Sequence, residues 1–378
     1  MRGIKIHFEK REKLSIVWRI LIPVICVLLA FIVSGLLMLM LGYNAFAAFD
    51  RLLYGGFGNM RNLSESILQA VPLMFCGLAV SVAFKMSLNN IGAEGQFMMG
   101  AFAATGVALF AKWIPEPLVL PIVIIAGFVG GGLWAVIAVA PRAKWGVNET
   151  IITLMFNYVA LLFVDYFVYG PWRDTTLLST NLPYSEKLPA HARMATLGGT
   201  RITYAVFIAI LATILIWIFF DKTVRGYQVR VIGANIKSAT YAGMSISRNI
   251  YIVMLISGGL AGLGGMASVT GTVGSLQPNL ASGAGYTAIV ISYLSKFNPF
   301  IVLVVSVLFG GLTQGGYNIQ LIGIPVHIVT TMQGLILLFV LGGEIFVRNR
   351  LVLTRTRSDD LYCVLENKDI EKGSAVNE

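Results

Sequence analysis

The sequence predicts an all-α fold, a polytopic transmembrane bundle of about ten helices, and three observations predict it. Apolar residues make up 57% of the 378 residues and charged residues only 12%, whereas soluble domains are about 25% charged. The charges are segregated, since none falls between Ile20 and Phe49 and only Lys296 falls between Arg248 and Glu344. The apolar runs do not alternate with polar residues, which favours helices over a membrane β-barrel.

Ten apolar segments account for the predicted helices. A helix needs about 20 apolar residues to cross a hydrocarbon core of about 30 Å. The segments are residues 17–42, 64–84, 96–111, 118–140, 151–168, 202–220, 249–271, 284–294, 299–317 and 325–346. The eighth has only 11 residues, so we expect a short helix, a half-helix or a re-entrant segment there. If it does not cross, the two termini would face opposite sides and the six cations of the tail would lie outside.

The distribution of Lys and Arg predicts the orientation. With the N-terminus in the cytoplasm and ten crossings, 21 of the 28 Lys and Arg residues lie inside and seven lie outside, as the positive-inside rule requires. We therefore expect both termini in the cytoplasm. The predicted organisation is a basic N-terminus (1–17), a transmembrane domain (18–346) with a cytoplasmic loop at 221–248, and a polar cytoplasmic tail (347–378).

The sequence carries no catalytic or cofactor motif. It has no phosphate-binding loop with a Gly-Lys-Ser/Thr ending, no His-Glu-x-x-His, no Cys-x-x-Cys and no Gly-x-Ser-x-Gly. The three cysteines are far apart, which argues against a disulfide framework or a metal site. The net charge of +10 comes from cations at helix ends, so it reflects membrane orientation and not a nucleic-acid partner. We expect no enzyme activity and no cofactor.

Polar residues inside or beside the apolar segments are the candidates for function. Asn90, Glu94 and Gln96 interrupt two apolar runs, and Asn148 and Glu149 precede the fifth segment. Asn157 lies two turns inside that segment. Such groups are costly near lipid unless they are paired or face water. They could cap helices and hold them together, or they could meet a polar solute.

Three motifs in this order resemble one family. Residues 90–96 read Asn-Ile-Gly-Ala-Glu-Gly-Gln, and residues 147–158 contain Val-Asn-Glu, Thr-Leu-Met and Asn-Tyr. Residues 225–244 contain Arg-Gly, Gly-Ala-Asn and Tyr-Ala-Gly-Met. Together they resemble permeases of the branched-chain amino acid/ribose-type ABC importers, nearest to the nucleoside and simple-sugar branch. The resemblance covers roughly residues 63–343.

The resemblance implies a mechanism with several partner chains. It implies a permease subunit in a bacterial plasma membrane, a separate cytoplasmic ATPase, an extracellular substrate-binding lipoprotein and a second permease, with a heterodimer expected. The candidate pathway residues, whose polar groups and rings suit a nucleoside or a sugar, are Asn90, Glu94, Gln96, Asn148, Glu149, Asn157, Tyr158 and Tyr293. The stretch around Tyr293 is more polar than the corresponding segment of the family. The resemblance assigns ATPase coupling to Arg225, Arg230, Gly233, Asn235, Ala239, Tyr241 and Gly243, with a short helix expected near residues 238–242.

Alternatives remain at this point. A nucleoside is the expected solute, and a simple sugar such as ribose fits the same polar groups. A secondary transporter that runs on an ion gradient would need an ionisable residue inside the membrane, and only Glu94 and Asp165 lie near the spans. A membrane-embedded enzyme is disfavoured by the absence of catalytic motifs.

Overall fold

The computed structural model describes residues 4–10, 16–111, 113–175, 183–325 and 327–355. By their contacts the residues divide into two units, one made of Met1–Val33 with Gly334–Glu378 and the other of Ser34–Gln333. The larger unit holds every predicted pathway and coupling residue. Most of the polar tail and part of the basic N-terminus lie outside the described residues.

Each of the ten predicted segments contains a helix. In chain order these are α1 (Ile16–Met40), α3 (Met60–Lys85), α4 (Ala93–Phe110), α5 (Glu116–Trp145), α6 (Glu149–Tyr169), α7 (Ala205–Lys222), α10 (Ile246–Ala267), α11 (Ala284–Leu294), α12 (Pro299–Gln320) and α13 (His327–Arg348). Seven helices are long and apolar enough to cross a membrane, namely α1, α3, α5, α6, α7, α10 with its extension, and α12. The eighth segment is a short helix with the expected bounds.

Several further elements connect these helices. Helix α2 (Ala45–Phe57) follows α1, and α8 (Val224–Ala234) and α9 (Ile236–Tyr241) form the loop between α7 and α10. A 3₁₀ turn, η1 (Ala190–Ala192), lies before α7, and a π-helical turn, η2 (Ser268–Val273), extends α10. Of these, only the short helix α9 was predicted from the sequence.

One strand pair, which was not predicted, joins the two ends of the described chain to each other. Strands β1 (Ile4–Lys10) and β2 (Asn349–Arg355) pair antiparallel, with Ile4 opposite Arg355 and Lys10 opposite Asn349. The reason is local, because Ile4, Ile6 and Phe8 alternate with polar residues, and a period of two favours a strand. Apart from this pair and two isolated bridges, the regular structure of the described residues is helical.

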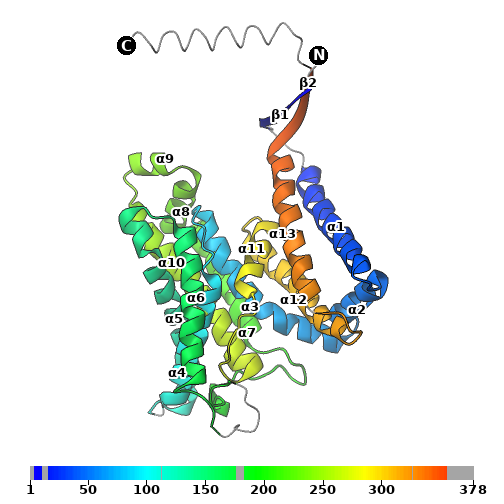
Figure 1. Ribbon diagram of the computed structural model, residues 1–378. Helices are drawn as coiled ribbons and strands as arrows, with labels where there is room; N and C mark the ends of the chain where they lie inside the picture. Colours follow the sequence, from blue (N-terminus) through cyan, green and yellow to red (C-terminus); the bar gives the residue numbers. More distant parts are fainter. Residues whose placement is uncertain (1–3, 11–15, 112, 176–182, 326, 356–378) are drawn as a thin grey trace. The chain divides into compact units, whose positions relative to one another are not determined.

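Glycines allow the central helices to pack closely. Helix α10 packs on α5, α4 and α3, and α5 packs on α4 (Figure 1). A Cβ atom added at Gly131 would lie 2.7 Å from the Cα of Gly262, and one at Gly127 would lie 2.6 Å from Met266. Contacts this short exclude any side chain, so the glycine pairs 127/131 and 258/262, each spaced by four residues, are packing surfaces. Gly311 and Gly315 of α12 play the same part against α2.

Two helices begin inside the bundle instead of at its end. Helix α11 has 11 residues and is therefore about 16 Å long, about half of the hydrocarbon thickness. Its N-cap Gly283 has φ +83°, and the preceding Ser282 also has a positive φ. Helix α4 begins after the extended segment 89–92, beside the middle of α6. Their N-termini bring the predicted polar residues together.

Candidate functional site

Two amide side chains form the centre of a buried polar cluster. The Nδ2 of Asn90 donates to Oε1 of Gln96 at 3.0 Å and to Oγ of Ser257 at 2.9 Å. In return, Nε2 of Gln96 donates to Oδ1 of Asn90 at 3.0 Å, and the amide N–H of Gly92 donates to the same oxygen at 2.9 Å. Asn90 and Gln96 are fully buried or nearly so. The pair therefore fixes the turn that starts α4.

Glu94 connects the N-termini of α4 and α11. It lies in the first turn of α4, where a carboxylate suits the helix dipole. Its Oε1 accepts from the N–H of Gly283 at 2.8 Å, and its Oε2 accepts from the N–H of Gly285 at 2.7 Å. Because those N–H groups open α11, one buried carboxylate caps a helix about 190 residues further along the chain. Gly285 permits this approach, since a Cβ there would lie 2.8 Å from the Cα of Glu94.

Asn157 ties the same region to α6. Its Oδ1 accepts from the N–H of Gly95 at 2.8 Å, and its Nδ2 donates to the carbonyl of Ile91 at 2.8 Å. The Nδ2 also donates to the hydroxyl of Tyr286 at 3.3 Å. Asn157 is fully buried. It therefore joins α6 to the start of α4 and to the first turn of α11.

Asn148 and Glu149 anchor the beginning of α6. Asn148 is the N-cap, and its side chain accepts from the N–H of Thr150 at 2.9 Å. Glu149 lies 3.3 Å from Nε of Arg142 and accepts from the N–H of Asn89 at 3.3 Å. The bond from Asn89 to Glu149 therefore holds the segment before α4 against the first turn of α6.

Five of the eight predicted pathway residues lie in the segment 89–96 or bond to it, namely Asn90, Glu94, Gln96, Glu149 and Asn157. A sixth, Asn148, caps the helix that carries Glu149 and Asn157. The side-chain oxygen and nitrogen atoms of Asn90, Glu94, Gln96 and Asn157 all have partners within the chain. The other two lie apart from them. Tyr158 points out of α6 with 55% of its surface exposed, and Tyr293 of α11 meets Phe84 and Phe297 edge-on at ring distances of 5.4 and 5.5 Å.

Sequence reasoning missed Tyr286. It stands seven residues before Tyr293, which is two turns along the same face of α11. It is 39% exposed although its hydroxyl is held by Asn157. The spacing of the two tyrosines was the signal that could have found it.

The predicted coupling loop contains a well-defined short helix. Asn235 caps α9 by accepting from the N–H groups of Lys237 at 2.9 Å and Ser238 at 3.2 Å. Gly243, with φ +70°, ends it, and the N–H of Met244 donates to the carbonyl of Ala239 at 3.0 Å. Ala239 is buried, whereas Tyr241 is 93% exposed. Helix α9, which follows α8 in Figure 1, is therefore anchored through Ala239, while Tyr241 is open to a partner.

The remaining predicted coupling residues hold α8 in place. Arg230 pairs with Asp221 at 3.3 Å, and Arg225 donates to Gln228 at 3.1 Å. A Cβ at Gly233 would collide with the backbone of Lys85, so α8 packs directly on the end of α3. The two arginines therefore have partners on α8 itself and on the end of α7.

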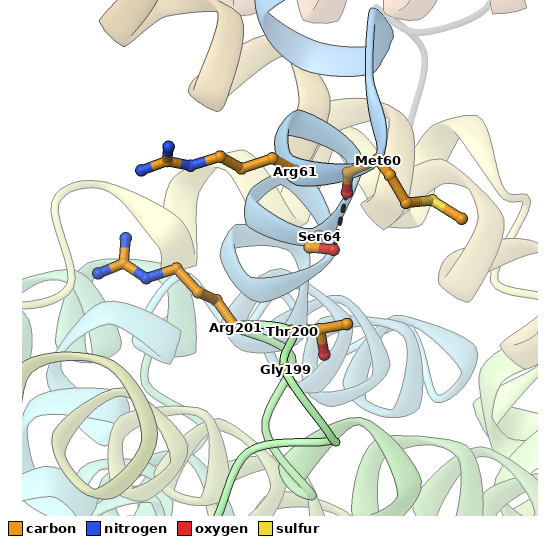
Figure 2. A pocket seen from close by; sticks show the side chains of 6 residues that line it. All are labelled: Met60, Arg61, Ser64, Gly199, Thr200 and Arg201. Carbon is orange, nitrogen blue, oxygen red and sulfur yellow. Dashed lines mark hydrogen bonds between the residues drawn. The ribbon is translucent and has the colours of Figure 1, made fainter.

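A separate basic pocket lies between the start of α3 and the turn before α7. It has a volume of about 490 Å³ and is lined by Met60, Arg61, Ser64, Gly199, Thr200 and Arg201. Figure 2 shows the side chains of Arg61 and Arg201 extending in the same direction. Glu65 lies 2.6 Å from Arg201, and this hydrogen bond raises the pKa of that guanidinium. The pocket has the charge to hold an acidic group, and none of its residues belongs to the polar cluster.

The comparison with known families follows the same segments. A model of the family described as "Branched-chain amino acid transport system / permease component" matches residues 62–341. The chain belongs to this family. It is a permease component of an ABC transporter, an integral protein of the plasma membrane, and not itself an enzyme. In the part of the chain that the structure describes, no three His, Cys, Asp or Glu side chains are grouped to hold a metal ion.

Curated relatives extend over most of this permease. It is 33% identical over 340 residues to the glucose ABC transporter permease protein TsgB13 of Haloferax volcanii, covering 87% of this chain and 88% of that protein. It is 32% identical to the guanosine ABC transporter permease protein NupP of Bacillus subtilis, covering 85% and 92%. It is 29% identical to the nucleoside ABC transporter permease protein NupB of Lactococcus lactis, covering 85% and 90%.

A solved structure, PsaBC from Streptococcus pneumoniae in complex with Fab, matches the permease at a TM-score of 0.41 and 15% identity. The match covers 77% of this chain and 94% of that chain. A likeness this loose has no bearing on the function of the permease.

Proposed function

We propose that this permease forms, with a second permease, the membrane pathway of an importer for nucleosides, driven by a separate ATPase subunit. The observation that carries the proposal is the similarity to guanosine and nucleoside permeases along almost the whole chain. A simple sugar is the second candidate, because the glucose permease relative is equally similar.

The polar cluster supports an uncharged solute. Where two helix N-termini meet inside a membrane, their positive ends attract an anionic group of a solute. Here Glu94 occupies that position and binds the N–H groups of Gly283 and Gly285. An amino acid carboxylate would meet an anion there, whereas a nucleoside or a sugar carries no charge that conflicts with it.

The same cluster disfavours an ion-coupled secondary transporter. Coupling needs an acidic side chain that can exchange protons or ions during the cycle. Glu94 is 3% exposed and both of its oxygens are bound by backbone N–H groups. Asp165 lies only one turn from the end of α6.

Helix α9 is the site we propose for the ATPase. A short helix that is capped at both ends transmits a push better than a flexible loop. Its outward residues include Ile236 and Tyr241, which are 49% and 93% exposed, and aromatic side chains of this kind often dominate binding at interfaces. An extracellular binding protein would deliver the solute at the opposite side of the membrane.

Pairs of relatives support a heterodimer. In Bacillus subtilis the chain matches NupP at 32% identity and NupQ at 24%, and in Lactococcus lactis it matches NupB at 29% and NupC at 24%. In Haloferax volcanii it matches TsgB13 at 33% and TsgC13 at 21%. Each organism thus has one permease more similar to this chain and one less similar, so we propose a second, different permease as the partner.

Uptake by the reconstituted importer tests the proposal. The permease is assembled in proteoliposomes with its partner permease, ATPase and binding protein, and labelled guanosine, uridine, ribose and glucose are offered with ATP inside. We expect ATP-dependent uptake of the nucleosides. Uptake of glucose or ribose alone would establish the sugar alternative, and accumulation by the isolated permease on an ion gradient would refute an ABC mechanism.

A further inference from the structure

Tyr286 combines a fixed hydroxyl with an open ring. Its hydroxyl accepts from Nδ2 of Asn157 at 3.3 Å, and 39% of the residue is exposed. Asn157 is itself held by Gly95 and Ile91, so the bond ties Tyr286 to a rigid part of the bundle. A ring held in this way offers a preorganised flat surface.

This surface lies near the middle of the membrane. Helix α6 has 21 residues and is about 31 Å long, which matches the hydrocarbon thickness. Asn157 stands eight residues from its start, about 12 Å along the helix axis. The Tyr286 hydroxyl bonded to it is therefore far from both membrane surfaces.

The surroundings of Tyr286 are polar. The Oγ1 of the neighbouring Thr287 donates to Oε1 of Gln333 at 3.3 Å, and Nε2 of Gln333 donates to Oγ1 of Thr313 at 3.5 Å. Polar side chains at this depth face the interior of a bundle or a water-filled passage, and rarely face lipid. The bonds of Thr287 and Gln333 therefore place this part of α11 against the bundle interior or a water-filled passage, and not against lipid.

Two further tyrosines lie on the helices that carry this bond. Tyr158, the residue after Asn157 in α6, is 55% exposed. Tyr293 lies two turns further along the same face of α11 and is partly exposed. Aromatic rings bind the flat faces of nucleobases by stacking, with little dependence on the base.

We propose that Tyr286 is a specificity-determining residue of the pathway, whose ring contacts the base of the solute in the middle of the membrane, and that Asn157 is the residue that positions it. The inference rests on the proposed nucleoside transport. It adds a residue that would favour a base-bearing solute over a sugar alone, because a nucleobase offers a flat π-face to the ring whereas a hexose offers only C–H groups.

The first test compares Tyr286→Phe with Tyr286→Leu in the reconstituted importer. The readout is guanosine uptake per ATP hydrolysed at saturating guanosine, which separates passage from the affinity of the binding protein. Phe keeps the ring, so we expect uptake within about twofold of wild type, whereas Leu removes stacking and should lower uptake on the order of tenfold. Tyr204→Leu, a similarly exposed tyrosine at the N-cap of α7, is the matched control and should leave uptake unchanged.

The second test does not depend on transport. Tyr286→Cys is made in a chain whose Cys26, Cys76 and Cys363 are replaced by serine, and a charged methanethiosulfonate reagent is added to the assembled importer. We expect the new thiol to react and guanosine to slow the reaction. No reaction would mean that the residue faces lipid and would overturn the proposal, as would wild-type uptake by the Leu variant.

The two proposals fail in different ways. If the wild-type importer carries glucose and no nucleoside, the proposed function is wrong. If it carries guanosine and the Leu variant carries it equally well, the function stands and Tyr286 has no part in specificity.

Discussion

At the scale of the residue, Glu94 shows how one side chain can serve structure and solute choice together. It is nearly fully buried, and its negative charge is balanced by backbone N–H groups instead of a basic side chain. Hydrogen bonds to a charged acceptor are stronger than neutral ones. The residue therefore caps α11, and in the proposed pathway it would also remove the positive potential that attracts an anionic solute.

Replacing Glu94 with Gln should destabilise the permease. Gln offers one acceptor oxygen in place of two, so the N–H of Gly283 or of Gly285 loses its partner. We expect a loss of about 2 kcal/mol, seen as a lower melting temperature of the purified chain in detergent. Glu116→Gln makes the same chemical change at an exposed carboxylate and is the control.

The opposite result is also informative. If Glu94→Gln melts like wild type but abolishes uptake, the carboxylate acts on the solute and its capping role is secondary.

At the scale of the element, the sequence predicted the helices better than their contacts. The positions of the helices could be predicted because each long apolar run is a local property of the sequence. Helix α2 was missed because Asp50, Arg51 and two glycines interrupt its apolar pattern, although the N-cap Asn44 marks its start. The motifs located most of the polar cluster, but the bonds of Glu94 join residues about 190 positions apart, and no local pattern reveals them.

Helix α9 gives a prediction for the partner ATPase. Tyr241→Ala removes the most exposed aromatic side chain of that helix without touching its caps. If the ring is an anchor, its loss should cost about 2 kcal/mol of binding, a roughly 30-fold weaker affinity. Co-purification shows whether the ATPase still binds the variant. Titration of the purified permease with the ATPase then measures the affinity.

The control for α9 is Tyr169→Ala, an exposed tyrosine at the far end of α6. Equal ATPase affinity for both variants and the wild type would remove α9 from the docking site. Loss of binding by the control alone would place the ATPase at the other side of the membrane.

At the scale of the whole molecule, the strand pair bears on topology. Strand β1 precedes α1 and β2 follows α13, and an antiparallel ladder between them requires that both lie on one side of the membrane. We therefore expect an even number of crossings, which the distribution of Lys and Arg also predicts. The strands were missed because the prediction relied on the composition of the whole chain. A short basic segment with alternating residues changes the apolar fraction of 378 residues very little.

Labelling in intact cells tests this topology. In the chain without native cysteines, we expect Thr200→Cys to react with an impermeant maleimide and Ser238→Cys to stay unlabelled until the cells are opened. The double variant Lys5→Cys/Thr354→Cys, whose Cα positions are opposite in the ladder, should form a disulfide on oxidation. The reverse labelling pattern would invert the orientation, and absence of the disulfide would contradict the strand pairing.

The bonds that converge on residues 89–96 limit which parts can move during transport. Separating α11 from α4 would leave a carboxylate without partners in an apolar medium, and moving α6 away would strand Asn157 as well. We therefore expect α4, α6 and α11 to move as one rigid body during transport. The conformational change would then occur in the segments that connect these helices to the rest of the bundle. An engineered crosslink within the trio should accordingly leave turnover intact.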